Sequence, residues 1–185
     1  QVFSNENIML AWLNMWDRNN PSSEYGFAGQ LTIPRSISVK NGKLLQAPIW
    51  DYSNKISKEI SNKLEDNFKY GAIKLNIKNL EEFEIKLREK DKQYFKAKLE
   101  NNEFVFDRSK MKQQINGVEK DLDSQNGIRR MPIENLDEVN IEIIMDEFSI
   151  EFFINGLSAS FQVFNDFDAD KLSLNIKASN CEYIK

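Results

Sequence analysis

The chain has 185 residues, 41% of them hydrophobic, and a formal net charge of −4 at pH 7, with no histidine and one cysteine. This length suits one domain, or one domain with a small piece of another, and the apolar content is sufficient for a core and argues against disorder. The composition excludes Ser-His triads, histidine metal ligands, an internal disulfide and a multi-cysteine zinc site, and the acidic balance argues against a nucleic-acid partner.

The first 52 residues differ in composition from the rest. They contain all three tryptophans and three of the four prolines. Their apolar run at residues 8–13 is far too short to cross a bilayer, so we expect no membrane association. A hairpin is predicted at residues 40–43, where Asn41-Gly42 separates two apolar segments. Because the chain begins with Gln1 and shows no signal peptide, we expect a processed end with further sequence upstream.

Alternation of apolar and polar residues dominates the chain after residue 52. This period of two predicts strands with one buried face and one wet face, which are typical of antiparallel sheets. Polar turns at 100–103, 146–147 and 155–156 separate several of these strands. The clearest alternating segments lie at residues 73–78, 83–88, 139–143 and 172–177.

Two segments do not alternate clearly. In residues 56–64, Ile56, Ile60 and Leu64 recur every four residues, which allows either one short helix or an irregular linker. Residues 110–132 are polar and weakly patterned, and we expect a long connection between strands. The overall pattern predicts an all-β fold, an antiparallel, jelly-roll-like β-sandwich over residues 53–185, preceded by a segment of different origin over residues 1–52.

Three groups of motifs occur in a recognisable order. Residues 25–35 end in Leu31-Thr32-Ile33-Pro34-Arg35 and are followed by a strand, the Asn41-Gly42 turn and residues 43–49. Asp107-Arg108-Ser109-Lys110 comes next, and then the strands at 148–156 and 160–164. Together they resemble the C-terminal part of glycoside hydrolase family 32, the β-fructosidases. The match departs from the family where Phe27 replaces a usual tryptophan, where Ser36 replaces an acidic residue, and at the weakened motif of residues 48–52.

The resemblance implies a domain organisation. Residues 1–52 would be the end of the last β-propeller blade, and residues 53–185 would be the C-terminal sandwich. The intact parent would hydrolyse β-fructofuranosides by double displacement, on sucrose or sucrose-6-phosphate in preference to levan or inulin. The family's three acidic motifs are absent from this sequence, so we expect the chain to have no catalytic residue of its own.

The resemblance also suggests partners. We expect a fructose-containing saccharide bound by the intact enzyme, and the protein's own N-terminal propeller, which the sandwich would stabilise. A homodimer is compatible with the pattern, and no cofactor or metal is expected. The parent would be cytoplasmic, or secreted if it is a levanase. The alternative function is a stand-alone carbohydrate-binding β-sandwich module.

The best candidates for saccharide contact lie in the first segment. Trp16 is either a pocket residue that stacks on a sugar face or a structural residue. Asn14 and Asp17 flank it and either bond sugar hydroxyls or, as we favour, cap the loop. We expect Trp12 to be a core residue on a strand. Arg35 either binds a phosphate or, as we favour, forms a structural salt bridge.

The remaining polar candidates have structural interpretations that we favour. Glu151 is expected on the wet face of a sandwich strand, and residues 107–110 are expected to form a surface turn. Asp166, Asp168 and Asp170 alternate as in some calcium loops, but no complete ligand loop accompanies them, and we expect no metal site. Arg129 and Arg130 are expected to be solvated, and six phenylalanines between residues 148 and 167 are expected to form the core and its rim.

Overall fold

The structure is a computed structural model that describes residues 1–3, 6–52, 55–117 and 127–185. Apart from the short 3₁₀ helix η1 (Pro21–Tyr25), its regular elements are β-strands, and all of their pairings are antiparallel. The predicted all-β class is therefore confirmed. No helix within these ranges is long and apolar enough to span a membrane.

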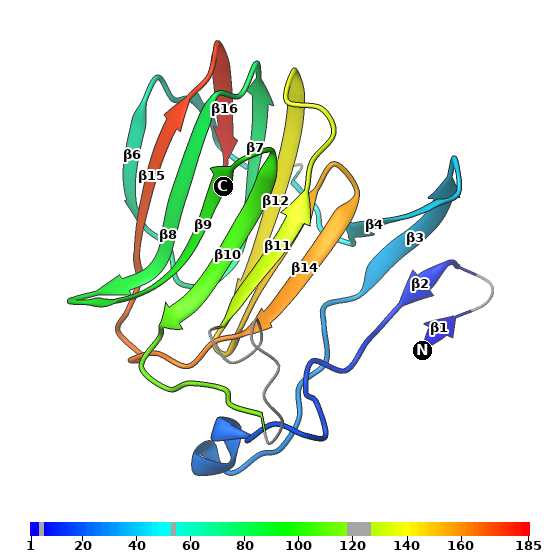
Figure 1. Cartoon of the computed structure of the whole chain (residues 1–185), viewed down its shortest axis with the longest axis vertical. Coiled ribbons are helices and arrows are strands. Elements are labelled where there is room, and N and C mark those ends of the chain that lie inside the picture. Colours follow the sequence, from blue (N-terminus) through cyan, green and yellow to red (C-terminus); the bar gives the residue numbers. More distant parts are fainter. Residues whose placement is uncertain (4–5, 53–54, 118–126) are drawn as a thin grey trace.

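Two six-stranded sheets pack face to face as a sandwich (Figure 1). The first sheet has the order β11-β10-β9-β8-β15-β6, and the second has the order β14-β13-β12-β7-β16-β5. The strands of the first sheet are β6 (Lys63–Asn67), β8 (Glu82–Lys90), β9 (Gln93–Glu100), β10 (Glu103–Lys110), β11 (Ile128–Pro132) and β15 (Lys171–Lys177). Those of the second are β5 (Ser57–Glu59), β7 (Gly71–Lys78), β12 (Glu138–Asp146), β13 (Ser149–Ile154), β14 (Leu157–Gln162) and β16 (Asn180–Ile184).

The core between the sheets follows from the alternation in the sequence. On β7 and β12, Leu75 lies opposite Ile141 and Ile77 lies opposite Val139, and all four are buried. Aromatic rings join the two sheets, since Phe95 of β9 stacks on Phe152 of β13 with ring centroids 5.8 Å apart. Burying such side chains stabilises each by about 1.5–3 kcal/mol, so this apolar layer is the main source of the sandwich's stability.

The segment before the sandwich forms a separate four-stranded sheet in the order β1-β2-β3-β4. Its strands are β1 (Val2–Phe3), β2 (Ile8–Met9), β3 (Arg35–Lys40) and β4 (Lys43–Pro48). The predicted hairpin is confirmed, and Asn41 and Gly42 both have positive φ, as its tight turn requires. Strand β4 contacts β14 and, to a lesser extent, β13, so the N-terminal sheet lies against the β14 side of the second sandwich sheet. Figure 1 shows β3 and β4 on that side of the molecule.

The helix alternative at residues 56–64 is wrong. Strand β5 pairs with β16 and strand β6 pairs with β15, so this segment supplies one edge strand to each sandwich sheet. The three residues do not share a strand, since Ile56 precedes β5, Ile60 lies between the two strands and Leu64 lies within β6. Ile60 and Leu64 are nevertheless both buried in the core, whereas Ile56 is exposed.

The long connection predicted at residues 110–132 is only partly correct. Residues 118–126 lie outside the described residues, but Ile128–Pro132 forms strand β11 and pairs with β10. Only Met131 of this edge strand is buried, which explains why its pattern is weak in the sequence. The turn predicted at residues 107–110 is instead the end of β10, where the register shifts at a β-bulge. The backbone N–H of Ser109 donates a hydrogen bond of 2.8 Å to the side-chain Oδ1 of Asp107 there.

Candidate functional site at the junction of the two regions

Strand β13 is buried on both of its faces. Ile150, Phe152 and Ile154 point into the sandwich, so Glu151 and Phe153 occupy the opposite face. That face is covered by the N-terminal segment, and the ring of Phe153 packs in a small second apolar cluster with Ala72, Ile144, Ile33 and Tyr52. Residues 1–52 and the sandwich therefore share a packed interface.

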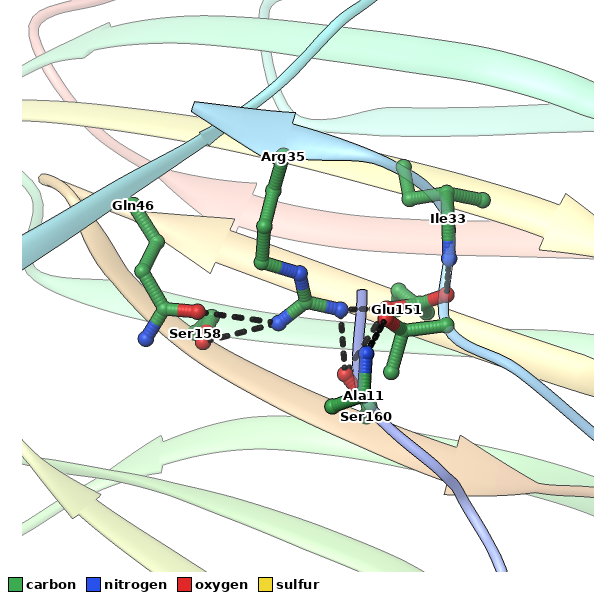
Figure 2. Close-up of polar contacts among 8 residues, drawn as sticks. Ala11, Ile33, Arg35, Gln46, Glu151, Ser158 and Ser160 are labelled. Atoms are coloured by element: carbon green, nitrogen blue, oxygen red, sulfur yellow. Dashed lines mark hydrogen bonds and ion pairs between the residues drawn. The ribbon is translucent and has the colours of Figure 1, made fainter. Parts of the chain in front are cut away.

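Glu151 is 1% exposed, so the prediction that it lies on a wet face is wrong. The alternation correctly predicted that Glu151 lies on the outer face of its sheet, but the N-terminal sheet covers that face and excludes water from it. Its carboxylate pairs with the guanidinium of Arg35, which is 3% exposed and comes from β3 (Figure 2). A buried charge of this kind is tolerated only when it is paired and hydrogen-bonded.

Neutral groups complete the shell around this carboxylate. The backbone N–H of Ile33 donates a hydrogen bond of 2.7 Å to Glu151 Oε1, and Ser160 Oγ donates one of 2.8 Å to Oε2 (Figure 2). Ile33 belongs to the N-terminal segment and Ser160 to β14. The carboxylate of Glu151 on β13 therefore contacts both β14 and the N-terminal segment, which lies more than 100 residues earlier in the chain.

The guanidinium is held through both of its Nη atoms, whereas its buried Nε has no hydrogen-bond partner among the described residues. Arg35 Nη1 donates to Gln46 Oε1 at 3.1 Å and to Ser158 Oγ at 3.3 Å, and its Cζ lies 5.0 Å from the ring centroid of Phe153. Burial lowers the pKa of Arg35, and the charge and hydrogen bond of Glu151 partly oppose that shift. This arrangement confirms the salt-bridge interpretation of Arg35, with both side chains used as structural links between the sheets.

The loop with the two tryptophans is more exposed than expected. Trp12 is 45% exposed, so its prediction as a core residue is wrong. It makes only an isolated bridge to Leu31, and its ring edge lies against Trp16 with centroids 4.7 Å apart. Gly29 lets the indole approach the backbone, since a Cβ there would lie 2.8 Å from Trp12 Nε1. Trp16 itself is 90% exposed.

The neighbours of Trp16 hold the loop in shape. Asn14 is buried, and its side-chain oxygen accepts a hydrogen bond of 2.7 Å from Gln30 N while its nitrogen donates to Asn20 Oδ1 at 3.0 Å. Asp17 lies 3.5 Å from the guanidinium Nε of Arg18. Asn14 is thus held by contacts within the loop, whereas the Asp17 side chain is 44% exposed and the Trp16 side chain is open to solvent.

A cleft of about 810 Å³ opens next to this loop. Leu13, Met15 and Arg18 line it from the N-terminal segment, together with Leu44 and Gln46 of β4. Residues of β10, β11 and β14 line the opposite side, including Arg108, Arg129 and Arg130. Arg108 lies on β10 and both Arg129 and Arg130 lie on β11. The sequence analysis did not predict that these arginines share one cleft, because it did not predict β11.

The other candidates have local partners. Asp166 pairs with Lys112, and Asp168 lies 2.6 Å from the ammonium of Lys90, so these carboxylates face lysines. In the described part of the chain, no three His, Cys, Asp or Glu residues are grouped to hold a metal ion. Cys181 is buried, and burial raises the pKa of its thiol to about 11.

A second hollow on the outer surface of the sandwich is strongly polar. It is lined by charged and amide side chains from β6, β8 and β15, among them Glu65, Lys86 and Asn175. No aromatic residue is among the described residues that line it. Stacking of a sugar ring on an aromatic face therefore has no support at this hollow.

Family comparisons match the two regions in order. The model for the glycosyl hydrolases family 32 N-terminal domain matches residues 1–48, and the model for the family 32 C-terminal domain matches residues 41–182. The chain belongs to glycoside hydrolase family 32. Its order of matches is that of the C-terminal part of a family 32 protein, as the sequence motifs had indicated.

Similar proteins support the assignment. The chain is 27% identical over 159 residues to the sucrose-6-phosphate hydrolase of Escherichia coli, covering 80% of this chain and 31% of that protein. It is 25% identical over 187 residues to the sucrose-6-phosphate hydrolase of Zymomonas mobilis, covering 89% and 35%. The chain thus spans about a third of the length of these curated relatives.

Solved structures of the family share the fold. The sucrose-6-phosphate hydrolase of Lactobacillus gasseri superposes with a TM-score of 0.78 at 16% identity, covering 96% of this chain and 38% of that one. The exo-inulinase of Aspergillus awamori gives a TM-score of 0.74 at 17% identity, covering 99% and 41%. At such identities the likeness shows the fold alone, a β-sandwich preceded by the remnant of a propeller blade.

Proposed function

We propose that this chain is the C-terminal portion of a β-fructofuranosidase that hydrolyses sucrose or sucrose-6-phosphate. The observation that carries this proposal is the alignment of 80% or more of the chain with sucrose-6-phosphate hydrolases. A retaining glycosidase needs a nucleophile and an acid/base carboxylate about 5–5.5 Å apart. The family's Asn-Asp-Pro-Asn, Arg-Asp-Pro and Glu-Cys motifs are not in this sequence, so the chain alone is expected to be inactive.

The role of the sandwich in this proposal is to hold the last blade of the propeller. The buried Arg35–Glu151 pair and the cluster around Phe153 support that role, because they fasten β3 to β13. Exposure supports it too. Of the thirteen large hydrophobic side chains that are exposed in the described residues, ten lie before residue 51. An apolar surface of this kind is typical of an interface, and the protein's own propeller is the proposed partner.

The boundary of the two domains is proposed at residues 52–53. A chain that begins at residue 53 retains both six-stranded sheets and the large apolar core, so it should fold cooperatively without the N-terminal sheet. Urea unfolding followed by circular dichroism would give one transition with a midpoint somewhat below that of the full chain. If the chain that begins at residue 53 showed no cooperative unfolding transition, the domain boundary would lie elsewhere.

Trp16 is the proposed point of saccharide contact in the intact enzyme. Its exposed indole offers an aromatic face, and Asn14 and Asp17 shape the loop that presents it. In the intact enzyme, Trp16→Ala should raise KM for sucrose while kcat changes less. An unchanged KM would remove Trp16 from the proposed site.

The decisive experiment is to sequence the gene upstream of the codon for Gln1 and to express the complete reading frame. The proposal expects the three acidic motifs upstream, and release of fructose from sucrose or sucrose-6-phosphate by the complete protein. The 185-residue chain is the matched control and should release none. A complete frame without these motifs would contradict the proposal.

A further inference from the structure

A segment that follows β10 in the sandwich crosses to the loop that carries Trp16. In Figure 1 the chain after β10 runs down to η1, and there residues 113–117 lie against residues 18–24. Gln113 Nε2, for example, donates a hydrogen bond of 2.8 Å to Glu24 Oε2. The sandwich therefore contacts the Trp16 loop at a place apart from the buried ion pair that links β3 to β13.

Asn19 is the centre of this contact. Its backbone N–H donates to the carbonyl oxygen of Asn116 at 3.0 Å, and its side-chain Oδ1 accepts from the backbone N–H of Asn116 at 2.6 Å. Its side-chain Nδ2 also donates to the carbonyl oxygen of Gln114 at 3.1 Å. One residue of the loop is thus hydrogen-bonded through three of its atoms to a segment that lies 95 to 97 residues later in the chain.

Asn19 comes directly after the turn that presents Trp16. The backbone N–H of Arg18 donates to the carbonyl oxygen of Met15 at 3.3 Å, so Trp16 lies at the second position of a β-turn. Asn14, just before this turn, is anchored by hydrogen bonds within the N-terminal segment. The turn is therefore fixed on one side by the N-terminal segment and on the other side by the sandwich.

We infer that Asn19 is a positioning residue, through which the sandwich sets the place of the Trp16 ring. The indole of Trp16 is 90% exposed, so burial of the side chain contributes little to holding it. Its place is set mainly by the backbone of its turn, which Asn19 ties to the sandwich. An aromatic ring that is ordered before its ligand arrives binds more tightly, since less conformational freedom is lost on binding. The effect on saccharide affinity rests on the proposed function of Trp16, whereas the position of the turn does not.

The contact between two indoles gives a direct readout in the 185-residue chain. The rings of Trp12 and Trp16 have centroids 4.7 Å apart, and two indoles at this distance produce an exciton couplet in the far-ultraviolet circular dichroism spectrum. Trp16→Ala should abolish the couplet and so identify it. Asn19→Ala removes the side-chain hydrogen bonds to residues 114 and 116, and the couplet should lose most of its intensity. Because Asn19 is exposed, this variant should fold.

Asn116→Ala is the matched control. It makes the same change at an exposed asparagine of the same contact, but Asn116 takes part through its backbone N–H and carbonyl group, which the substitution retains. Its couplet should match that of the unaltered chain. An equal loss of the couplet in both variants would contradict the inference, because the side-chain bonds of Asn19 would then not be what positions the ring.

The complete enzyme separates positioning from chemistry. Asn19→Ala should raise KM for sucrose about twofold to fivefold, the effect of one ordinary hydrogen bond, and should leave kcat unchanged. Asn116→Ala should change neither constant. If Trp16→Ala leaves KM unchanged, the proposed saccharide contact fails, and the couplet alone decides whether Asn19 positions the ring.

Two further results would overturn the inference. The first is an unchanged couplet in Asn19→Ala, which would mean that the N-terminal segment holds the turn without the sandwich. The second is a lost couplet with an unchanged KM in Asn19→Ala, although Trp16→Ala raises KM. The position of the ring that Asn19 sets would then have no bearing on saccharide affinity.

Discussion

The N-terminal sheet and the sandwich differ in how much of their apolar side-chain surface they bury. In the sandwich, strands such as β7 and β12 bury their apolar side chains between two sheets, and residues such as Leu75 and Ile141 are fully covered. In the N-terminal sheet, Val2, Phe3 and Val39 remain exposed. The sandwich therefore supplies its own core, whereas the N-terminal sheet depends on a neighbour for its apolar surface.

The two regions are joined by apolar contacts and by one buried polar cluster. Tyr25 and Phe27 pack on Phe148 with ring centroids 4.9 and 5.3 Å away, and Ile33 and Tyr52 pack in the cluster around Phe153. The Arg35–Glu151 pair and its shell of Gln46, Ser158 and Ser160 stand where a continuous apolar core would be expected within a single domain. Polar junctions fix one geometry more strictly than apolar ones, since each donor needs its acceptor. The buried pair and its shell thus favour a defined orientation of β3 on β13, in addition to the apolar contacts.

The largest expected effect compares one phenylalanine from each region. Phe152→Ala removes a fully buried ring that contacts Phe95 and Phe106, and should lower the free energy of unfolding by about 3–5 kcal/mol. Phe3→Ala removes a half-exposed ring and should cost less than about 1 kcal/mol. Urea denaturation of both variants gives the two values. Similar losses would show that the N-terminal sheet has a core of its own.

The junction itself is tested by Glu151→Ala. This change leaves the buried guanidinium of Arg35 unpaired and should cost about 3 kcal/mol, with faster hydrogen exchange in β3 and β4 than in β7 and β12. The double variant Arg35→Met/Glu151→Leu removes both charges and should regain much of that loss. If the double variant lost the sum of the two single changes, the pair would not act as a unit.

A smaller effect is expected where β6 of one sandwich sheet meets β16 of the other. Asp66 accepts hydrogen bonds from Tyr183 at 3.0 Å and from Lys185 at 2.9 Å. Burial raises the pKa of Asp66, but these two bonds and the charge of Lys185 outweigh it, and the net pKa is lowered. A lowered folded pKa adds stability above the unfolded value of about 4 and loses it as the pH falls through the folded value.

Asp66→Asn should therefore cost about 1 kcal/mol at pH 7, and the difference from the unaltered chain should shrink as the pH falls below about 4. Thermal unfolding between these pH values measures the difference. A gap that stays constant with pH would show that Asp66 contributes through packing and not through its charge.

The smallest effect is expected for Trp16→Ala in the isolated chain. The indole is almost fully exposed and contacts Trp12 by an edge, so the free energy of unfolding should change by less than about 0.5 kcal/mol. Thermal denaturation is sufficient to measure it. A loss of several kcal/mol would mean that the loop supports the fold and does not merely display a ring.

The sequence predicts much of this molecule because period-two patterns are unambiguous when one face of a strand is wet. β7, β12 and β15 alternate in this way, and each was predicted within a few residues of its bounds. β6 was ambiguous because two short strands of different sheets follow each other there, and Ile56, Ile60 and Leu64 belong to no single strand. β11 was missed because it is an edge strand with two exposed arginines and a final proline.

The candidate site was harder to predict than the fold. Alternation shows that Glu151 lies outside the core, but it does not reveal that Arg35, 116 positions earlier in the chain, covers it. The Pro34-Arg35 motif was the one available signal, and it supported a salt bridge without naming the partner. The arginines of the cleft gave no joint signal, since contacts between distant residues leave no trace in a single sequence.

The state of Cys181 has a practical consequence for experiments on this protein. The thiol is 2% exposed and its pKa is raised to about 11, so at neutral pH it presents almost no reactive thiolate. The folded chain is consequently an inert background for maleimide chemistry. One cysteine introduced on the β3–β4 hairpin and another on the sandwich would carry the only dyes, and energy transfer between them would follow the two regions in solution.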